Sequence, residues 1–455
     1  MAGIGWKLEK MLARDSLGST LQAYLTGVAV TSAPWLLTTT VLVTLRFLSR
    51  GHGTPAFAAV EHLITIAYAV TLVLSAPIHV VVSRHVADRL YEKRLDLVGE
   101  PLRRALTFTL LVFLVVGAAT VAIVGFPLQL AVPGVMLTAI IAAQWLLLSV
   151  GGGMSSPAGV LGAFAIGAGF SMVMAIGLES FDGMGARGYL LGFTLGQAVA
   201  LAGMLVQILR SLPADETPVT DAALRGAFGE YHLLALSALA VHAAVWVDKL
   251  ATLAVRGAAE ASLLASASAL AWFTLIPAFA WIYLQVETGF YRVFWRYFRG
   301  IETGSTLDHL EANAADLRRE AGRLVRGAAV IQATVMAFGV LAAPEVVAAL
   351  GLPATATQAL RLSLVSAGLQ VSTLLGLLLL YYLDLRREAC LVALAQLFAV
   401  GAATLVVLVA GAPAARGAAL GAVVPAAYGL VVVHHAMVTL VPSTFQSQPY
   451  AAGKR

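Results

Sequence analysis

The chain has 455 residues, of which 60% are hydrophobic and only 12% are charged, and its formal net charge is +5. Soluble domains carry about 25% charged residues, so this composition excludes an ordinary soluble protein and predicts a membrane protein. The basic residues are scattered between apolar runs without interleaved aromatic residues, which argues against a nucleic-acid-binding surface. The single cysteine, Cys390, excludes an intramolecular disulfide and a cysteine-based metal cluster.

Twelve apolar segments of about 20 or more residues follow one another along the chain, and a helix of that length crosses ~30 Å of hydrocarbon. Ahead of the first, residues 1–19 predict an interfacial helix, because Ile4, Leu8 and Met11 share one helical face. In the sixth, GFTLG at 192–196 is a GxxxG pattern, which predicts close helix packing. The expected spans are 20–48, 57–82, 105–125, 130–150, 158–178, 189–209, 231–255, 269–290, 327–350, 358–383, 388–410 and 417–440.

These spans predict an all-α, polytopic membrane protein made of two halves. Pro77 near the end of the second span and Pro277 in the eighth are each followed by an apolar–tyrosine pair and then by a long charged segment. Such a repeat is typical of transporters built from two repeated bundles. The expected parts are the interfacial helix 1–19, an N-terminal six-helix bundle 20–209, a linker 210–230, a C-terminal six-helix bundle 231–440 with the charged segment 291–326, and a tail 441–455.

Lysine and arginine predict the orientation. If the N-terminus is cytoplasmic, the segments on that side hold 22 of the 29 basic residues and the opposite loops hold four. The positive-inside rule then places both termini in the cytoplasm. No opposite loop exceeds 13 residues, the longest being 256–268, which is too short for a catalytic domain. We therefore expect a protein that acts within the membrane and is not an enzyme.

Ionisable residues inside the spans predict a transport path. Each costs about 2.5–3.5 kcal/mol at the centre of a span, so such residues usually face a bundle interior or water. The main candidates are Glu61, His62 and His79 in the second span, His242, Asp248 and Lys249 in the seventh, and Glu287 in the eighth. His242 and Lys249 share a helical face, whereas Asp248 is rotated by about 100° from Lys249, so we expect Asp248 to have another partner.

Each candidate also has a simpler interpretation. Lys249 could snorkel to the nearer interface, and Asp248 could be part of a structural ion pair that ties spans together. Glu61 and His62 could lie in the external headgroup zone, and Glu287 at the inner interface.

The charged segment 291–326 predicts a docking surface for a cytoplasmic partner. It opens with YRVFWRYFRG, which places Trp295 and Phe298 among Arg292, Arg296 and Arg299. This is more aromatic surface than a connector needs. The alternative is an interfacial helix that rests on lipid.

Several motifs resemble one family. They are MAGIGWKLEKMLARDSL at 1–17, SRHVADRLYEKR at 83–94, WVDK at 246–249, VETGFYRVFWRYF at 286–298 and YYLDLRREA at 381–389. Together they resemble PelG, the inner-membrane transporters of the Pel biofilm exopolysaccharide within the multidrug/oligosaccharidyl-lipid/polysaccharide (MOP) flippase superfamily. The resemblance implies twelve helices in two six-helix bundles around a central cavity, lined by spans one, two, seven and eight.

The resemblance also implies a function. It indicates transport of an N-acetylgalactosamine-rich amino-sugar polymer across the inner membrane, without a cofactor or metal, beside a cytoplasmic PelF-like glycosyltransferase. PelD- and PelE-like membrane partners are expected too, the former binding cyclic-di-GMP. Aromatic residues of the lining spans suit a neutral sugar polymer, although an aromatic belt at the interfaces would also explain them. They are Trp35, Trp246, Trp272, Trp281 and Tyr283.

Two other functions remain open. A cation-coupled multidrug antiporter of the same superfamily would need a deeply buried carboxylate as its ion site, and Asp248 is the plausible one. A non-transporting scaffold subunit of the polysaccharide synthase complex would act only together with its partners. A membrane-integral glycosyltransferase is disfavoured, because the chain has no large external loop or cytoplasmic catalytic domain.

Overall fold

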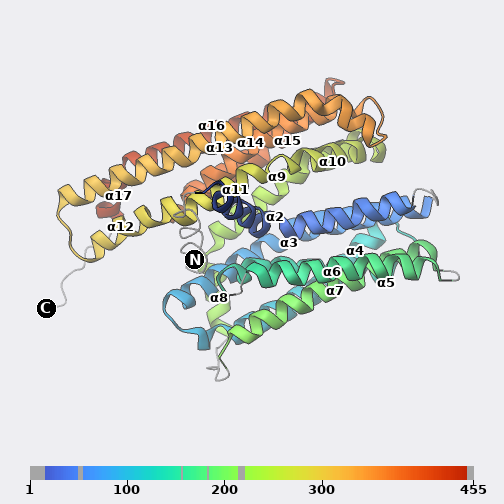
Figure 1. Ribbon diagram of the computed structural model, residues 1–455, viewed down its shortest axis with the longest axis horizontal. Helices are drawn as coiled ribbons and strands as arrows, with labels where there is room; N and C mark the ends of the chain where they lie inside the picture. Colours follow the sequence, from blue (N-terminus) through green and yellow to red (C-terminus); the bar gives the residue numbers. More distant parts are fainter. Residues whose placement is uncertain (1–15, 50–54, 155–156, 182–183, 214–220, 448–455) are drawn as a thin grey trace. The chain divides into compact units, whose positions relative to one another are not determined.

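The computed structural model describes residues 16–49, 55–154, 157–181, 184–213 and 221–447 (Figure 1). Within these ranges the chain is helical apart from short connections, and no strand occurs, in agreement with the predicted all-α class. The predicted interfacial helix 1–19 lies almost entirely outside the described residues. By its contacts the chain divides into two compact units, which we call unit 1 (residues 32–242) and unit 2 (residues 17–31 together with 243–447).

Unit 1 is built around α5, which packs against α3, α4 and α7, while α6 packs along α7. Its larger apolar clusters lie around Leu63, Leu137 and Phe193 and around Leu102 and Leu146. Its complete helices are α3 (Pro55–Tyr91), the 3-10 turn η2 (Leu95–Leu97), α4 (Gly99–Val124), α5 (Leu128–Met154), α6 (Pro157–Glu179), α7 (Gly185–Ser211) and α8 (Asp221–Glu230).

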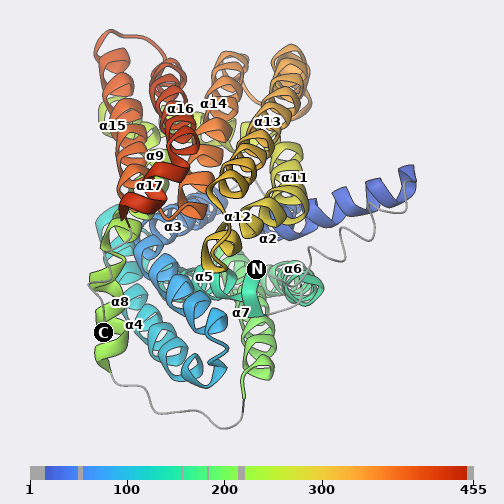
Figure 2. The same ribbon diagram turned by 90° about the vertical axis from the view of Figure 1, so that its left-hand side faces the viewer.

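Unit 2 is built around α14, which packs against α10, α13, α15 and α16. Figure 2 shows α14 between α13 and α16. Its complete elements are α10 (Ala258–Phe273), α11 (Ile276–Gln285), the π-turn η3 (Val286–Phe290), α12 (Tyr291–Glu302), α13 (Leu307–Ala349), α14 (Ala356–Tyr382), α15 (Arg386–Val409), α16 (Ala414–Val438) and α17 (Leu440–Ser447).

Two helices have residues in both units, α2 (Leu17–Ser49) and α9 (His232–Arg256). Residues 17–31 of α2 belong to unit 2 because they pack on α11. The Tyr24 hydroxyl donates a hydrogen bond to the Pro277 carbonyl oxygen at 2.5 Å, and Ala23 packs against Leu284. These contact-defined units therefore do not coincide with the predicted bundles 20–209 and 231–440, which stay predictions about how the spans are grouped in the membrane.

In the part of the chain that the structure describes, ten helices are long and apolar enough to cross a membrane, or eleven if one bent pair counts as a single span. Their positions agree with the predicted spans two to twelve. The predicted first span, 20–48, coincides with α2, several of whose side chains lie outside the described residues, so the number twelve stays a prediction. The ninth span, predicted at 327–350, is only the second part of the 43-residue helix α13.

The eighth span differs from its prediction because it begins earlier and is broken. Residues 256–268, expected as a loop, are mostly helical, since Gly257 (φ 89°) is the single residue between α9 and α10, which starts at Ala258. The helix axis then bends by 42° between α10 and α11. Pro277 stands in the first turn of α11, and its ring and missing N–H cannot continue the preceding helix.

Close helix packing at GFTLG, predicted from its two glycines, is confirmed. A Cβ added at Gly192 would come within 2.3 Å of the Ala175 backbone, and one at Gly196 within 1.8 Å of the Ser171 hydroxyl, so α6 and α7 meet through bare backbone. The sequence GAALG at 417–421 serves α15 and α16 in the same way, because a Cβ at Gly421 would lie 2.5 Å from Val400 Cα. Each unit thus contains a helix pair whose close approach depends on glycines.

Candidate functional site

Two of the three histidines of the transport-path prediction, His79 and His242, come together in unit 1. The rings of His79 on α3 and His242 on α9 form an edge-to-face pair with their centroids 5.8 Å apart. His242 Nδ1 lies 2.7 Å from the Ala238 carbonyl oxygen, which can only accept, so this nitrogen carries a proton. His79 Nδ1 is buried and has no hydrogen-bond partner among the described residues. The pair joins two of the spans that were predicted to line a cavity.

Glu61 and His62 lie apart from that pair, near the start of α3. His62 is exposed, and its ring meets Phe126 edge to face at 5.7 Å. Glu61 is half-buried, and its carboxylate is close enough to the buried Tyr189 on α7 to act on it electrostatically. Their roles in a transport path stay predictions.

Asp248 and Lys249 form an ion pair with each other in unit 2. Lys249 Nζ lies 3.1 Å from Asp248 Oδ1 and also donates a hydrogen bond to the Val245 carbonyl oxygen at 2.8 Å. Asp248 is only 3% exposed. The side chain of Lys249 is 12% exposed, so it does not extend into water as a snorkelling lysine would.

This geometry corrects the expectation that Asp248 pairs with another residue. The rotation of 100° per residue fixes only the direction of the Cα–Cβ bonds, and the flexible stem of Lys249 lets its ammonium group swing back along the helix. Because both partners belong to α9, the pair does not tie two spans together. The adjacent Trp246 is half-buried, and its indole N–H has no acceptor among the described residues.

Glu287 lies in the π-turn η3, within the VETGF sequence. An extra residue in a helical turn leaves backbone groups without their usual partners, and such turns are frequent at functional sites. The Glu287 carboxylate is half-buried and acts electrostatically on the hydroxyls of Tyr283 on α11 and Tyr382 on α14. A carboxylate and two tyrosines thus lie in one region of unit 2.

Tyr382 was not predicted from the sequence, although YYLDLRREA contains it. Its ring meets Phe290 at 5.5 Å and Phe294 at 5.6 Å, both edge to face, and its hydroxyl is buried without a partner among the described residues. A polar group held in an aromatic cluster is what a ligand rich in hydroxyl groups could engage. The signal in the sequence was a tyrosine pair at the end of an otherwise aliphatic span.

The remaining aromatic candidates have mixed surroundings. Tyr283 packs near Ala23 and Leu284 in unit 2, and Trp281 lies against Gly327 of α13. Trp272 is half-buried near the end of α10. The side chain of Trp35 lies outside the described residues.

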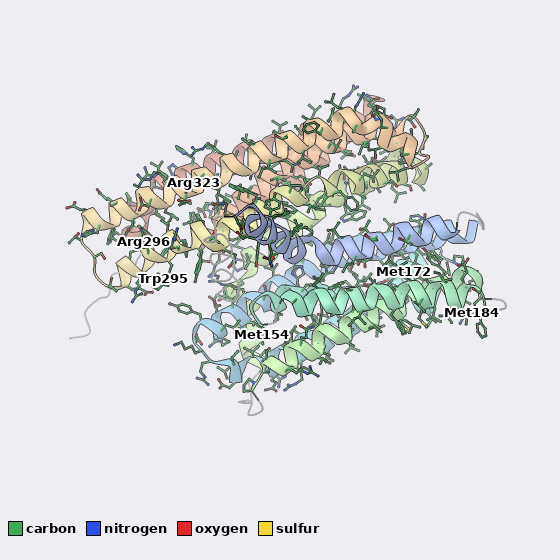
Figure 3. The ribbon with its side chains drawn as sticks, in the orientation of Figure 1. Met154, Met172, Met184, Trp295, Arg296 and Arg323 are labelled. Carbon is green, nitrogen blue, oxygen red and sulfur yellow. The ribbon has the colours of Figure 1, made fainter. Side chains whose placement is uncertain are left out.

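The predicted docking residues are on α12, whose polar and apolar faces differ strongly. Figure 3 labels two of them, Trp295 and Arg296. Trp295 is 49% exposed, and the Arg299 guanidinium lies 4.6 Å from the centre of its ring. Arg296 pairs with Asp316 of α13 at 3.6 Å. Phe298 instead belongs to the interior aromatic cluster, 4.6 Å from Phe294, so it offers less surface than expected. Arg292 is exposed on the same helix.

The SRHVADRLYEKR motif forms a polar junction in unit 1. Asp88 pairs with Arg84 at 3.3 Å and accepts a hydrogen bond of 2.5 Å from the Tyr231 hydroxyl. Burial, followed by this bond to Asp88, raises the pKa of Tyr231 to about 12. The motif therefore fastens the end of α3 to the start of α9.

The sequence profile of the PelG family, described as "Putative exopolysaccharide Exporter (EPS-E)", matches residues 1–445. The chain belongs to this family. The resemblance predicted from the sequence motifs is thereby confirmed, and the protein is grouped with exporters and not with enzymes. No curated protein matches the chain.

Solved structures of MOP-superfamily transporters have the same fold. A multidrug resistance MATE family transporter of this superfamily, in an outward-facing conformation, has 15% identity and a TM-score of 0.66, covering 92% of this chain and 96% of its own. A MOP superfamily transporter from Pyrococcus furiosus has 15% identity and a TM-score of 0.66, covering 91% and 96%. A MATE protein in the bent conformation has 15% identity and a TM-score of 0.65, covering 98% and 99%. At such identities the likeness concerns the fold, which is that of a multi-pass membrane transporter.

Proposed function

We propose that this member of the PelG family exports an N-acetylgalactosamine-rich polysaccharide across the bacterial inner membrane, with both termini in the cytoplasm and a cytoplasmic glycosyltransferase supplying the chain. The match of the family profile to residues 1–445 carries the proposal. The distribution of lysine and arginine supports the orientation. PelD- and PelE-like proteins are proposed as membrane partners.

In this proposal the transport path is made of polar and aromatic groups that can exchange hydrogen bonds with sugar hydroxyls. The candidates within unit 2 are Trp246, Asp248, Lys249 and Glu287, to which Tyr382 is added. The candidates within unit 1 are Glu61, His62, His79 and His242. A neutral polymer needs no fixed counter-charge. The pairing of Asp248 with Lys249 suits such a substrate, because it leaves no net charge on that part of α9.

The antiporter alternative is less well supported by α9. A cation bound at Asp248 would have to displace the ammonium group of Lys249 from 3.1 Å, and an ion site normally leaves its carboxylate open to the ion. The scaffold alternative is separated from transport by experiment. In a strain lacking this gene but retaining the synthase genes, polymer should accumulate in the cytoplasm, and it should not form when the synthase genes are also absent.

That experiment has a clear opposing outcome. If polymer still leaves cells that lack this protein, another carrier performs export. If polymer is absent from both cytoplasm and medium, the protein is needed for synthesis, which is the scaffold function. Reintroducing the intact gene should restore secretion to the medium.

We further propose that α12 docks the glycosyltransferase through Trp295 and its neighbouring arginines, Arg292 and Arg296. Trp295→Gln should weaken co-purification of the glycosyltransferase while the protein stays in the membrane. Phe181→Gln is the matched control, because Phe181 is 69% exposed and lies between α6 and α7. Phe298→Gln is a poorer test, since it would also disturb the aromatic cluster. Unchanged co-purification of the Trp295 variant would favour a helix that rests on lipid.

A further inference from the structure

One face of α13 carries a dense basic stripe. Arg318, Arg319, Arg323 and Arg326 all lie within nine residues, and all four are exposed. Arg319 pairs with Asp316, and Arg323 pairs with Glu320 at 2.6 Å. Among the described residues, Arg318 and Arg326 have no carboxylate partner. The stripe therefore keeps a positive excess that its own helix does not neutralise.

Two shallow grooves follow this stripe and share Arg326. The first, of about 380 Å³, is lined by Ala315, Arg318, Arg319, Gly322 and Arg326. The second, of about 400 Å³, is lined by Trp281, Arg323, Arg326, Gly327, Val330 and Ile331. Figure 3 shows Arg323 on α13, near the end of unit 2 where Trp295 and Arg296 lie on α12.

The second groove changes from basic to apolar along its length. After Arg326 the helix carries no charged residue before Glu345, and Val330 is 66% exposed. Trp281 of α11 forms the floor, because Gly327 has no side chain and a Cβ there would lie 2.5 Å from the indole ring. The groove thus has two guanidinium groups at one end and an aliphatic and aromatic wall at the other.

This combination selects among possible occupants. A soluble protein could reach the arginines but not the wall, which belongs to a helix long and apolar enough to cross the membrane. A free phosphate would use the arginines alone. An anionic phospholipid matches both ends, since its phosphate can accept hydrogen bonds from guanidinium groups while its acyl chain lies along apolar side chains.

We propose that this groove is a binding site for an anionic phospholipid. Arg323 and Arg326 hold the phosphate, and Val330, Ile331 and Trp281 contact the upper part of one acyl chain. The site is separate from the docking surface on α12 and does not depend on the substrate of transport. It makes the α11–α13 face of unit 2 selective for the charge of the surrounding lipid.

The test is lipid binding to the purified full-length protein in detergent, followed by native mass spectrometry. Phosphatidylglycerol and phosphatidylcholine are the probes. We expect a clear preference for phosphatidylglycerol, which should fall by about fivefold for each arginine replaced in Arg323→Gln and Arg326→Gln. The Arg323→Lys/Arg326→Lys double variant keeps the charge and should retain most of the preference. Inorganic phosphate and glycerol phosphate should compete poorly, because they lack acyl chains.

The matched control is the Arg187→Gln/Arg416→Gln double variant. Both residues are exposed arginines on other helices, α7 and α16, and their loss changes the net charge by the same amount. The control should keep the preference of the unchanged protein. Equal binding of the two lipids, an equal loss in the control, or full competition by glycerol phosphate would each overturn the proposal. Thermal unfolding of every variant checks that the fold is intact.

Discussion

The two units differ in how far their buried polar side chains are hydrogen-bonded within the protein. In unit 1, the Gln144 amide on α5 donates to the backbone oxygen and the side-chain oxygen of Gln197 on α7, and the Trp145 indole donates to Thr71 on α3. In unit 2, Gln332 is 3% exposed, yet neither of its amide atoms has a hydrogen-bond partner among the described residues. Among the described residues, and leaving out Arg84 Nε and Asp248 Oδ1 because they belong to ion pairs, three buried side-chain atoms of unit 1 lack a hydrogen-bond partner, against ten of unit 2.

This difference separates buried polar groups that bond to other groups of the protein from buried polar groups that have no such bond and could bind a ligand. A buried polar group without a partner costs about 1–3 kcal/mol, so a stable interior normally pairs such groups or replaces them. Unit 1 uses its glutamines as links between helices. Unit 2 has buried hydroxyl and amide groups on α13, α14 and α15 that do not link helices by hydrogen bonds. Under the proposed function, these groups are candidates for binding a hydroxyl-rich substrate.

The largest expected effect comes from the ion pair on α9. Lys249→Gln should leave the Asp248 carboxylate buried and alone, which costs about 3–5 kcal/mol for a buried pair. Asp248→Asn should cost less, because the longer Lys249 side chain can move toward an interface. The double variant should cost least. Assays of export at matched membrane levels, together with thermal unfolding, measure the order of the losses in the three variants. Equal export and stability in all three variants would mean that the pair serves neither fold nor path.

A labelling experiment asks whether water reaches this pair. Asp248→Cys in a Cys390→Ser background should react with an impermeant thiol reagent in at least one state of the transporter, if Asp248 lines the path. Absence of labelling, with normal export in the charge variants, would assign the pair to structure.

A glutamine from each unit provides a direct test of the comparison. Gln144→Leu removes two hydrogen bonds and takes from the Gln197 side-chain oxygen the donor that Gln144 supplies, so we expect a loss of about 2 kcal/mol in the free energy of unfolding. Gln332→Leu removes two groups that have no partner, so stability should stay equal or rise. Chemical denaturation of the two variants, side by side, gives the answer. Equal losses would remove the distinction between the units.

Tyr382→Phe should separate stability from function. It deletes a buried hydroxyl that has no hydrogen-bond partner among the described residues, so the free energy of unfolding should rise by up to about 1 kcal/mol. If the hydroxyl binds substrate, export should fall despite this gain. Thr71→Val is the control in unit 1, because it takes away the acceptor of Trp145 and should lower stability without a specific effect on export. Unchanged export in Tyr382→Phe would exclude the tyrosine from the path.

The smallest expected effect concerns the junction at Tyr231. Tyr231→Phe removes one hydrogen bond to Asp88, whose side chain is 30% exposed, so the loss should be about 1 kcal/mol or less. Limited proteolysis between α7 and α9 should become faster, because the end of α3 no longer bonds to Tyr231 at the start of α9. Proteolysis at an unchanged rate would mean that the ion pair with Arg84 is sufficient.

The positions of the helices can be predicted from the sequence better than the contacts of their side chains. Length and hydropathy located spans two to twelve, and two glycines predicted the α6–α7 packing, because both depend on local composition. The break before Pro277 was missed, since the proline lies inside an apolar run whose length suffices for one span. The partner of Asp248 was predicted wrongly, because a helical wheel ignores where a long side chain ends. Tyr382 acquires its interest only from rings on η3 and α12 that lie far from it in sequence.

The break between α10 and α11 also has an electrostatic consequence. A helix end carries roughly half an elementary charge, negative at the carboxyl end and positive at the amino end. The 42° bend therefore places the carboxyl end of α10 beside the amino end of α11 inside an apolar stretch, with no ionisable side chain involved. Half-helix ends of this kind attract ions and polar groups in transporters. Neutralising charged residues would leave this dipole pair untouched, whereas Pro277→Ala would allow the helix to close and cancel it.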